Sequence, residues 1–93
     1  MSITVILPDP LRELAGGHAK IELEGALATV GDALSSLRVR YPGVYDRILT
    51  EQGRLRPHIN VFVGRDDIRW SGGLGTPLAE SNEVLILPAV SGG

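Results

Sequence analysis

Alternating apolar and polar residues predict three β-strands, at 1–7, 19–24 and 58–63. Side chains along a strand point to opposite faces of a sheet in turn, and β-branched residues, which are frequent here, favour strands. A further apolar run at 83–87 predicts the last strand, and a shorter run at 68–70 predicts a small strand before it. The chain therefore contains four full strand candidates and one short one.

The connections between these strands are rich in turn residues. Residues 11–18 are predicted to form a loop with a turn at Gly16-Gly17, and so short a connection favours an antiparallel hairpin. Residues 64–67 are predicted to form a turn whose two aspartates are solvated. A tight connection then runs to a second turn signal at Ser81-Asn82.

Between the second and third strands the apolar period changes to that of a helix, over residues 29–41. The apolar positions at helical spacing are Val30, Ala33, Leu34, Leu37 and Tyr41. Thr29 is a good N-cap, and Asp32 three residues later resembles a capping box. Pro42-Gly43 is predicted to stop this helix, and residues 44–50 to add one or two further turns.

The order of elements indicates an α+β fold of the β-grasp type. We expect a mixed sheet of four to five strands with one main helix on one face. Right-handed crossover connections make the first and last strands parallel neighbours in mid-sheet. The length of 93 residues fits one domain. We assign residues 1–88 to this domain and 89–93 to a flexible C-terminal tail.

Composition and charge exclude several classes of function. The chain has no cysteine, which excludes disulfides and thiol chemistry. It has only two histidines, so we expect no histidine-rich metal site. A formal net charge of −2 gives no footprint for nucleic acid. No apolar run could span a bilayer and no signal peptide is evident, so we expect a cytoplasmic protein. Neither a nucleophile elbow nor a phosphate loop is present. We therefore expect no catalytic residue, metal or bound cofactor on this chain.

The informative feature is the ending Val90-Ser91-Gly92-Gly93, which Pro88 and Ala89 connect to the last predicted strand. Glycine has no Cβ, so two terminal glycines make the slimmest peptide that can carry a carboxylate into a narrow channel. A carboxylate is inert towards nucleophiles until it is activated, and an acyl-adenylate formed from ATP is the usual route. The ending predicts that Gly93 is the reactive position and that Val90, Ser91 and Gly92 serve tail recognition.

This ending, with the length and element order of the whole chain, resembles the ubiquitin-like sulfur carriers of the ThiS/MoaD superfamily. Further stretches are similar to the CysO-type carriers of cysteine biosynthesis. They are Ile59 to Val63, Asp67 to Leu74 and Glu83 to Gly93. Ser91 stands where alanine or threonine is common in the family, which we expect to matter little.

The resemblance implies a reaction cycle in which the chain is a co-substrate. An activating enzyme of the MoeB/ThiF type, often with a sulfurtransferase domain, would adenylate Gly93, and a persulfide would convert it to a thiocarboxylate. In the CysO branch the sulfide is donated to an aminoacrylate made from O-phosphoserine on a PLP-dependent cysteine synthase. A metallopeptidase then releases cysteine. ATP, PLP and zinc would belong to these partner enzymes.

A docking face follows from strand parity, independently of the family. We expect the helix to cover one sheet face, formed by Ile3, Val5, Ile59, Val61, Val63, Val84 and Ile86. Ile6, Phe62, Leu85 and Leu87 have the opposite parity and are predicted to form a partner-binding face. Residues 8–18 or 71–82 could instead bury them. Four arginines could frame the face and meet an acidic partner. They are Arg12, Arg54, Arg56 and Arg69.

Other functions remain open on the sequence alone. The same tail would suit the small subunit of a molybdopterin synthase or a thiamine-thiazole sulfur carrier. It would also suit a ubiquitin-like modifier that ends on a lysine of a target protein. This chain has one lysine, Lys20, so chains of the protein on itself would be restricted. A β-grasp interaction module that is never conjugated is the remaining alternative.

Overall fold

The computed structural model describes residues 2–25, 27–78 and 83–88. In this part of the chain the strands are β1 (Ser2–Ile6), β2 (Lys20–Glu24), β3 (Ile59–Val63), β4 (Asp66–Asp67) and β5 (Glu83–Pro88). The α-helices are α1 (Asp9–Arg12), α2 (Val30–Arg40) and α3 (Pro42–Ile48). The 3-10 helices are η1 (Glu13–Ala15), η2 (Ile68–Trp70) and η3 (Gly73–Gly75). The expected turn at Ser81-Asn82 lies outside the described residues.

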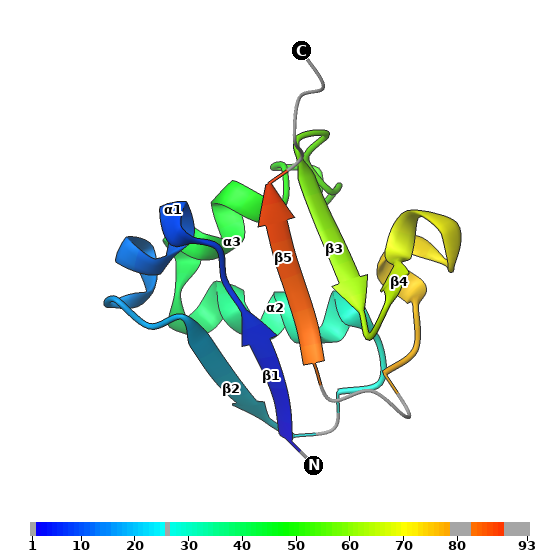
Figure 1. The fold of residues 1–93 in the computed structure, drawn as a ribbon, viewed down its shortest axis with the longest axis horizontal. Coiled ribbons are helices and arrows are strands. Elements are labelled where there is room, and N and C mark those ends of the chain that lie inside the picture. The colour runs from blue at the N-terminus through cyan, green and yellow to red at the C-terminus, as the bar shows by residue number, and fades with distance from the viewer. Residues whose placement is uncertain (1, 26, 79–82, 89–93) are drawn as a thin grey trace.

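The strands form a single mixed sheet in the order β2-β1-β5-β3-β4. β1 and β5 are parallel neighbours in its middle, and the other pairs are antiparallel. Figure 1 shows β5 between β1 and β3, with the end of β5 on the side of the molecule opposite the start of β1. The predicted β-grasp arrangement and its central parallel pair are confirmed.

Helices α2 and α3 lie behind the sheet in Figure 1 and cover one of its faces. The seven strand residues predicted for this face are all buried, together with Val30, Ala33, Leu34 and Leu37 of α2. Val44 and Ile48 of α3 complete this layer of the core. Within the described residues, no helix has the length and apolar character needed to cross a membrane.

The start of α2 has the predicted capping box. The Asp32 backbone N–H donates to Thr29 Oγ1 at 3.2 Å, and the Thr29 N–H donates to Asp32 Oδ2 at 3.1 Å. These bonds satisfy amide groups that have no partner inside the helix. α2 ends before Tyr41, and Pro42 begins α3 at once, because a proline in the first helical turn needs no backbone donor.

The loop predicted for residues 11–18 is wrong in its first half. The structure has α1 and η1 there, with Leu11 and Ala15 buried. These two apolar residues are four positions apart, which places them on one side of a helical turn. Arg12 pairs with Asp9, and its Nε donates to the Leu7 carbonyl oxygen at 3.1 Å. The expected turn at Gly16-Gly17 is present, with φ values of 67° and 88°.

The strand predicted at 68–70 is also wrong, because this segment is the 3-10 helix η2. The Asp67 side chain accepts a hydrogen bond from the Arg69 N–H at 2.9 Å and so caps this helix. The short strand is instead Asp66–Asp67, which pairs with the end of β3. The predicted turn of 64–67 is accordingly shorter. A side-chain cap that competes with extended backbone explains the difference.

Candidate functional site

The structure places the end of β5 against β3, where Pro88 lies opposite Ile59. Because β5 is held between β1 and β3, the chain leaves a paired central strand rather than a loop. The predicted reactive and recognition residues follow within five positions. These residues, Val90, Ser91, Gly92 and Gly93, lie outside the described part of the chain, so their roles stay predictions.

The four residues predicted for partner binding come together on the sheet face that α2 does not cover. Leu85 of β5 lies opposite Ile6 of β1 on one side and opposite Phe62 of β3 on the other. Leu87 is two residues further along β5 and shares their face. We call these four residues the open face. Strand register brings them together from segments up to about 80 residues apart in the sequence.

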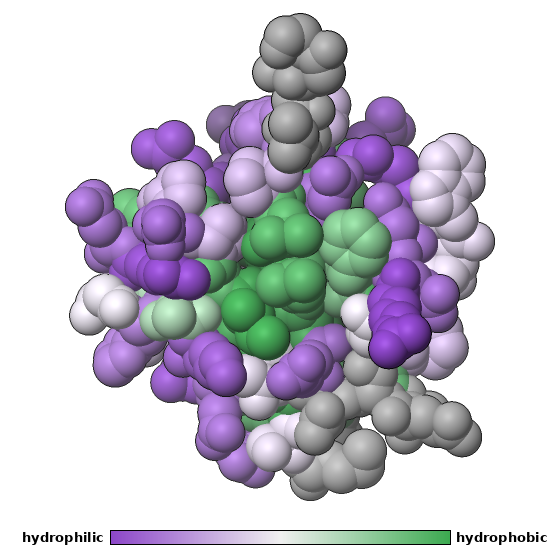
Figure 2. Space-filling view, in the orientation of Figure 1, coloured by the Kyte–Doolittle hydropathy of each residue, from purple (hydrophilic) through white to green (hydrophobic). Residues whose placement is uncertain are grey.

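The open face is only partly shielded from solvent. Ile6, Phe62 and Leu85 are half-buried, and Leu87 is 38% exposed. Figure 2 shows an apolar area in the middle of the sheet, bordered by hydrophilic residues. Two residues of this border lie beside the open face on the outer strands. Lys20 of β2 is opposite Ile6, and Asp67 of β4 is opposite Phe62. Neither residues 8–18 nor the described residues of 71–78 bury the four side chains fully.

The arginines expected to frame this face occupy different environments. Arg12 is fixed beside Leu7, and Arg56 Nε donates to the Asp46 carbonyl oxygen at 2.7 Å. Arg69 Nη2 donates to the Ile59 carbonyl oxygen at 3.2 Å, next to the end of β5. Arg54 is exposed, and its side chain makes no hydrogen bond or ion pair with the described residues. Arg54 and Arg69 line a separate groove.

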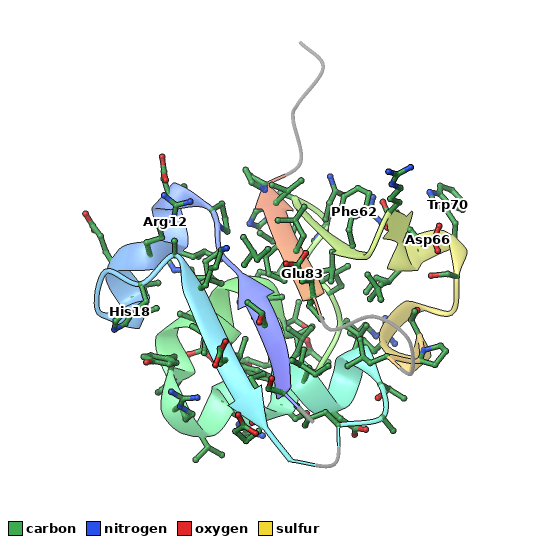
Figure 3. All side chains as sticks on the ribbon, turned by 60° about the horizontal axis from the view of Figure 1, so that its bottom comes forward. Arg12, His18, Phe62, Asp66, Trp70 and Glu83 are labelled. Carbon is green, nitrogen blue, oxygen red and sulfur yellow. The ribbon has the colours of Figure 1, made fainter. Side chains whose placement is uncertain are left out.

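Trp70, which the sequence prediction placed in a strand, is 84% exposed at the end of η2. Figure 3 shows Trp70 and Asp66 at the β4 side of the molecule and His18 at the opposite side. His18 and His58 are both exposed. The sequence did not distinguish Trp70, because a segment of three residues is too short to show a hydrophobic period.

Known proteins match this chain over almost its whole length. The model of the ThiS family matches residues 5–93. The sulfur carrier protein CysO of Mycobacterium tuberculosis is 38% identical over 95 residues, which span 100% of both chains. This match includes the terminal residues that the structure does not describe.

Solved structures agree with this match. The crystal structure of the Amycolatopsis orientalis BexX/CysO complex has a chain with a TM-score of 0.84 at 37% identity, covering 98% of this chain and 99% of that one. The crystal structure of small archaeal modifier protein 1 from Haloferax volcanii has a TM-score of 0.80 at 33% identity, covering 100% of both chains. The fold is therefore shared by sulfur carriers and by a protein modifier.

Proposed function

The chain belongs to the ThiS family, and we propose that it is a sulfur carrier whose C-terminal Gly93 is converted to a thiocarboxylate. The observation that carries this proposal is the Gly92-Gly93 ending, five residues after a central strand, in a chain similar along its full length to a sulfur carrier. As a carrier, the protein is consumed and regenerated by enzymes and does not act as a catalyst itself.

The chemistry requires three steps. The Gly93 carboxylate attacks the α-phosphate of ATP, which forms an acyl-adenylate and releases pyrophosphate. A persulfide on a sulfurtransferase then displaces AMP and forms an acyl disulfide. A second thiol cleaves this disulfide by exchange, which leaves the thiocarboxylate on Gly93 and a disulfide on the enzyme. Each step needs groups from a partner, so the carrier has only to present its terminus.

The fold suits such presentation. Six residues from Pro88 to Gly93 span about 20 Å when fully extended. That reach lets the folded body remain on the surface of an enzyme while the terminus enters an active site. Pairing of Leu87 and Pro88 with β3 fixes the starting point of the tail. Glycines at the last two positions fit a narrow channel because they have no side chain.

The partners that we propose follow from the similarity to CysO. The first is a MoeB/ThiF-type activating enzyme with a sulfurtransferase, which uses ATP. The second is a PLP-dependent cysteine synthase that accepts sulfide from Gly93 onto an intermediate made from O-phosphoserine. The third is a zinc metallopeptidase that releases cysteine from the carrier. The cofactors ATP, PLP and zinc would be held by these enzymes.

We further propose that the open face contacts these enzymes. An apolar surface with a polar border is typical of an interaction site. The face also adjoins the end of β5, because Leu87 directly precedes Pro88. An enzyme that covers Leu87 would therefore meet the tail at the point where it leaves the sheet.

A ubiquitin-like modifier is the second candidate, and the similarity to small archaeal modifier protein 1 favours it. In this reaction a lysine amine of another protein would displace AMP from Gly93 and form an isopeptide bond. Both functions use the same acyl-adenylate, and only the attacking nucleophile differs. Lys20 is the single lysine of this chain.

Intact-mass measurement separates these functions. The protein is incubated with an activating enzyme, ATP and a sulfur source. A sulfur carrier gains the mass difference between one sulfur and one oxygen, whereas a modifier appears as higher-mass adducts on other proteins. Deletion of Gly93, or addition of one alanine after it, should abolish the change while the thermal midpoint of unfolding stays the same. An unchanged mass in the intact protein would contradict the proposal.

A further inference from the structure

A groove of about 630 Å³ lies at the β4 side of the molecule, and none of its described lining residues belongs to the open face. Its walls come from the loop after α3 and from the segment that contains η2 and η3. Four apolar residues, Leu55, Pro57, Ile68 and Leu74, and two arginines, Arg54 and Arg69, line it. We call it the arginine groove.

The charged side chains that line the arginine groove are positive. Arg54 and Arg69 contribute to its lining, and no described residue of the lining is acidic. The Arg54 guanidinium makes no bond to other described residues, and Arg69 uses one of its five N–H donors on the Ile59 carbonyl oxygen. Both side chains can therefore donate to a carboxylate, which guanidinium groups bind in a bidentate manner.

The walls of the groove also leave backbone accessible. Gly53 and Gly73 have φ values of 78° and 60°, and a Cβ at either position would meet nothing within 4 Å. The positive φ favours glycine at these turns. Without side chains, these two positions allow the main chain of a bound segment to approach closely.

The groove adjoins the end of β5. Arg69 binds the carbonyl oxygen of Ile59, and Ile59 lies opposite Pro88. Pro57, two residues before Ile59, also lines the groove. A protein that receives the tail beyond Pro88 would thus lie close enough to place a second element in the groove.

We propose that the arginine groove binds an acidic-aliphatic segment of the enzyme that receives the tail, with aliphatic side chains on Leu55 and Leu74 and carboxylates on Arg54 and Arg69. This inference rests on the proposed function for the identity of the partner. The apolar residues of the lining favour a peptide segment over a simple anion, because an anion would gain nothing from those four side chains. The two arginines of the lining select acidic segments over basic ones.

Backbone amide NMR of the full chain tests the proposal with two synthetic peptides. One alternates glutamate and leucine over five residues, and the other has lysine in place of glutamate. We expect the acidic peptide to shift amide signals within 53–57 and 68–74, and the lysine peptide to shift none. Arg54→Glu should weaken binding of the acidic peptide by about tenfold or more, because it removes a charge-assisted hydrogen bond and adds a repulsive charge.

Arg65→Glu is the matched control, because Arg65 is exposed in the turn between β3 and β4 and does not line the groove. It should leave peptide binding unchanged, and both variants should unfold at the same temperature as the parent protein. Equal shifts with the lysine peptide, or shifts confined to the open face, would overturn the proposal. So would shifts of the groove amides with protein concentration alone, since a second copy would then be the occupant.

The sulfur-loading reaction tests the proposed function separately from the groove. Formation of the thiocarboxylate on Gly93 needs no peptide, so a groove that fails to bind peptide leaves the proposed function intact. If instead Gly93 is never loaded while the acidic peptide binds, the groove is a peptide site and its assigned partner is wrong.

Discussion

The two faces of the sheet have similar side chains and different environments. Val84 and Ile86 of β5 point to the face covered by α2 and α3 and are 0% exposed. Leu85 and Leu87, which alternate with them, point to the open face, where Leu87 is 38% exposed. Hydropathy alone does not separate the two sets, because all four residues are large and aliphatic. Strand parity separates them.

The difference shows which residues of the sheet contribute most to stability and which leave an apolar surface exposed. A strand with only one covered face needs apolar residues on alternate positions, and polar residues elsewhere would be sufficient for folding. β5 is apolar at both parities from Val84 to Leu87. The surplus on the open face contributes less to stability, and we propose that it serves the binding of a partner.

The largest effect is expected on the covered face. Ile86→Ala should lower the free energy of unfolding by about 2–5 kcal/mol, because it leaves a cavity in a closely packed core. At about 4–8 °C for each kcal/mol, the thermal midpoint should fall by at least about 8 °C. Urea unfolding followed by circular dichroism measures the loss. Leu85→Ala, one residue earlier, is the control and should cost about half as much or less. Equal losses would mean that the open face belongs to the core.

A change on the open face should act on docking. Leu87→Asp places a charge within the proposed contact, beside the start of the tail, which should raise the KM of the activating enzyme for the carrier by about tenfold or more. The rate at saturation should be retained, because Gly93 is unchanged. Pyrophosphate release at increasing carrier concentration measures both values.

Ser35→Asp, on the exposed surface of α2, is the matched control for this charge. It should leave KM unchanged. If Leu87→Asp instead lowers the thermal midpoint as much as Ile86→Ala does, the assignment of Leu87 to a binding face is wrong.

The regular spacing of buried residues along the strands and along α2 explains why so much of the fold could be predicted. The strands of the sheet centre and α2 each bury one periodic set of residues, and that periodicity is visible in the sequence. The errors fall at residues 11–15 and 68–70, which form short helical turns. Contacts between side chain and backbone support both turns, and hydrophobic periodicity does not encode such contacts.

The candidate site also has one part that the sequence predicts and one part that it does not. The open face follows from strand parity, so its four residues could be named from the sequence. The arginine groove could not, because it forms where residues 53–57 meet residues 68–74 in three dimensions. Sequence analysis placed Arg54 and Arg69 around the open face. The bond from Arg69 to Ile59, which fixes one wall of the groove, has no sequence signal.

A smaller effect is expected at the start of α2, which holds the covering layer in place. Thr29→Ala removes the hydroxyl that accepts from Asp32 and should cost about 1 kcal/mol of stability. Thr29→Ser keeps that hydroxyl and should retain most of the stability. Thermal unfolding of the three proteins measures the difference. A loss in Thr29→Ser equal to that in Thr29→Ala would assign the effect to packing of the threonine methyl group instead of to capping.

The smallest effect tests whether exposure alone makes an apolar residue functional. Val39 is 85% exposed on α2, more than any residue of the open face, but it stands alone there between Arg38 and Arg40. Val39→Lys should change stability by no more than about 0.5 kcal/mol and should leave the KM for the carrier unchanged. The same pyrophosphate assay and urea titration measure both quantities. A rise in KM comparable to that of Leu87→Asp would move the docking surface to the helical side and remove the distinction between the two faces.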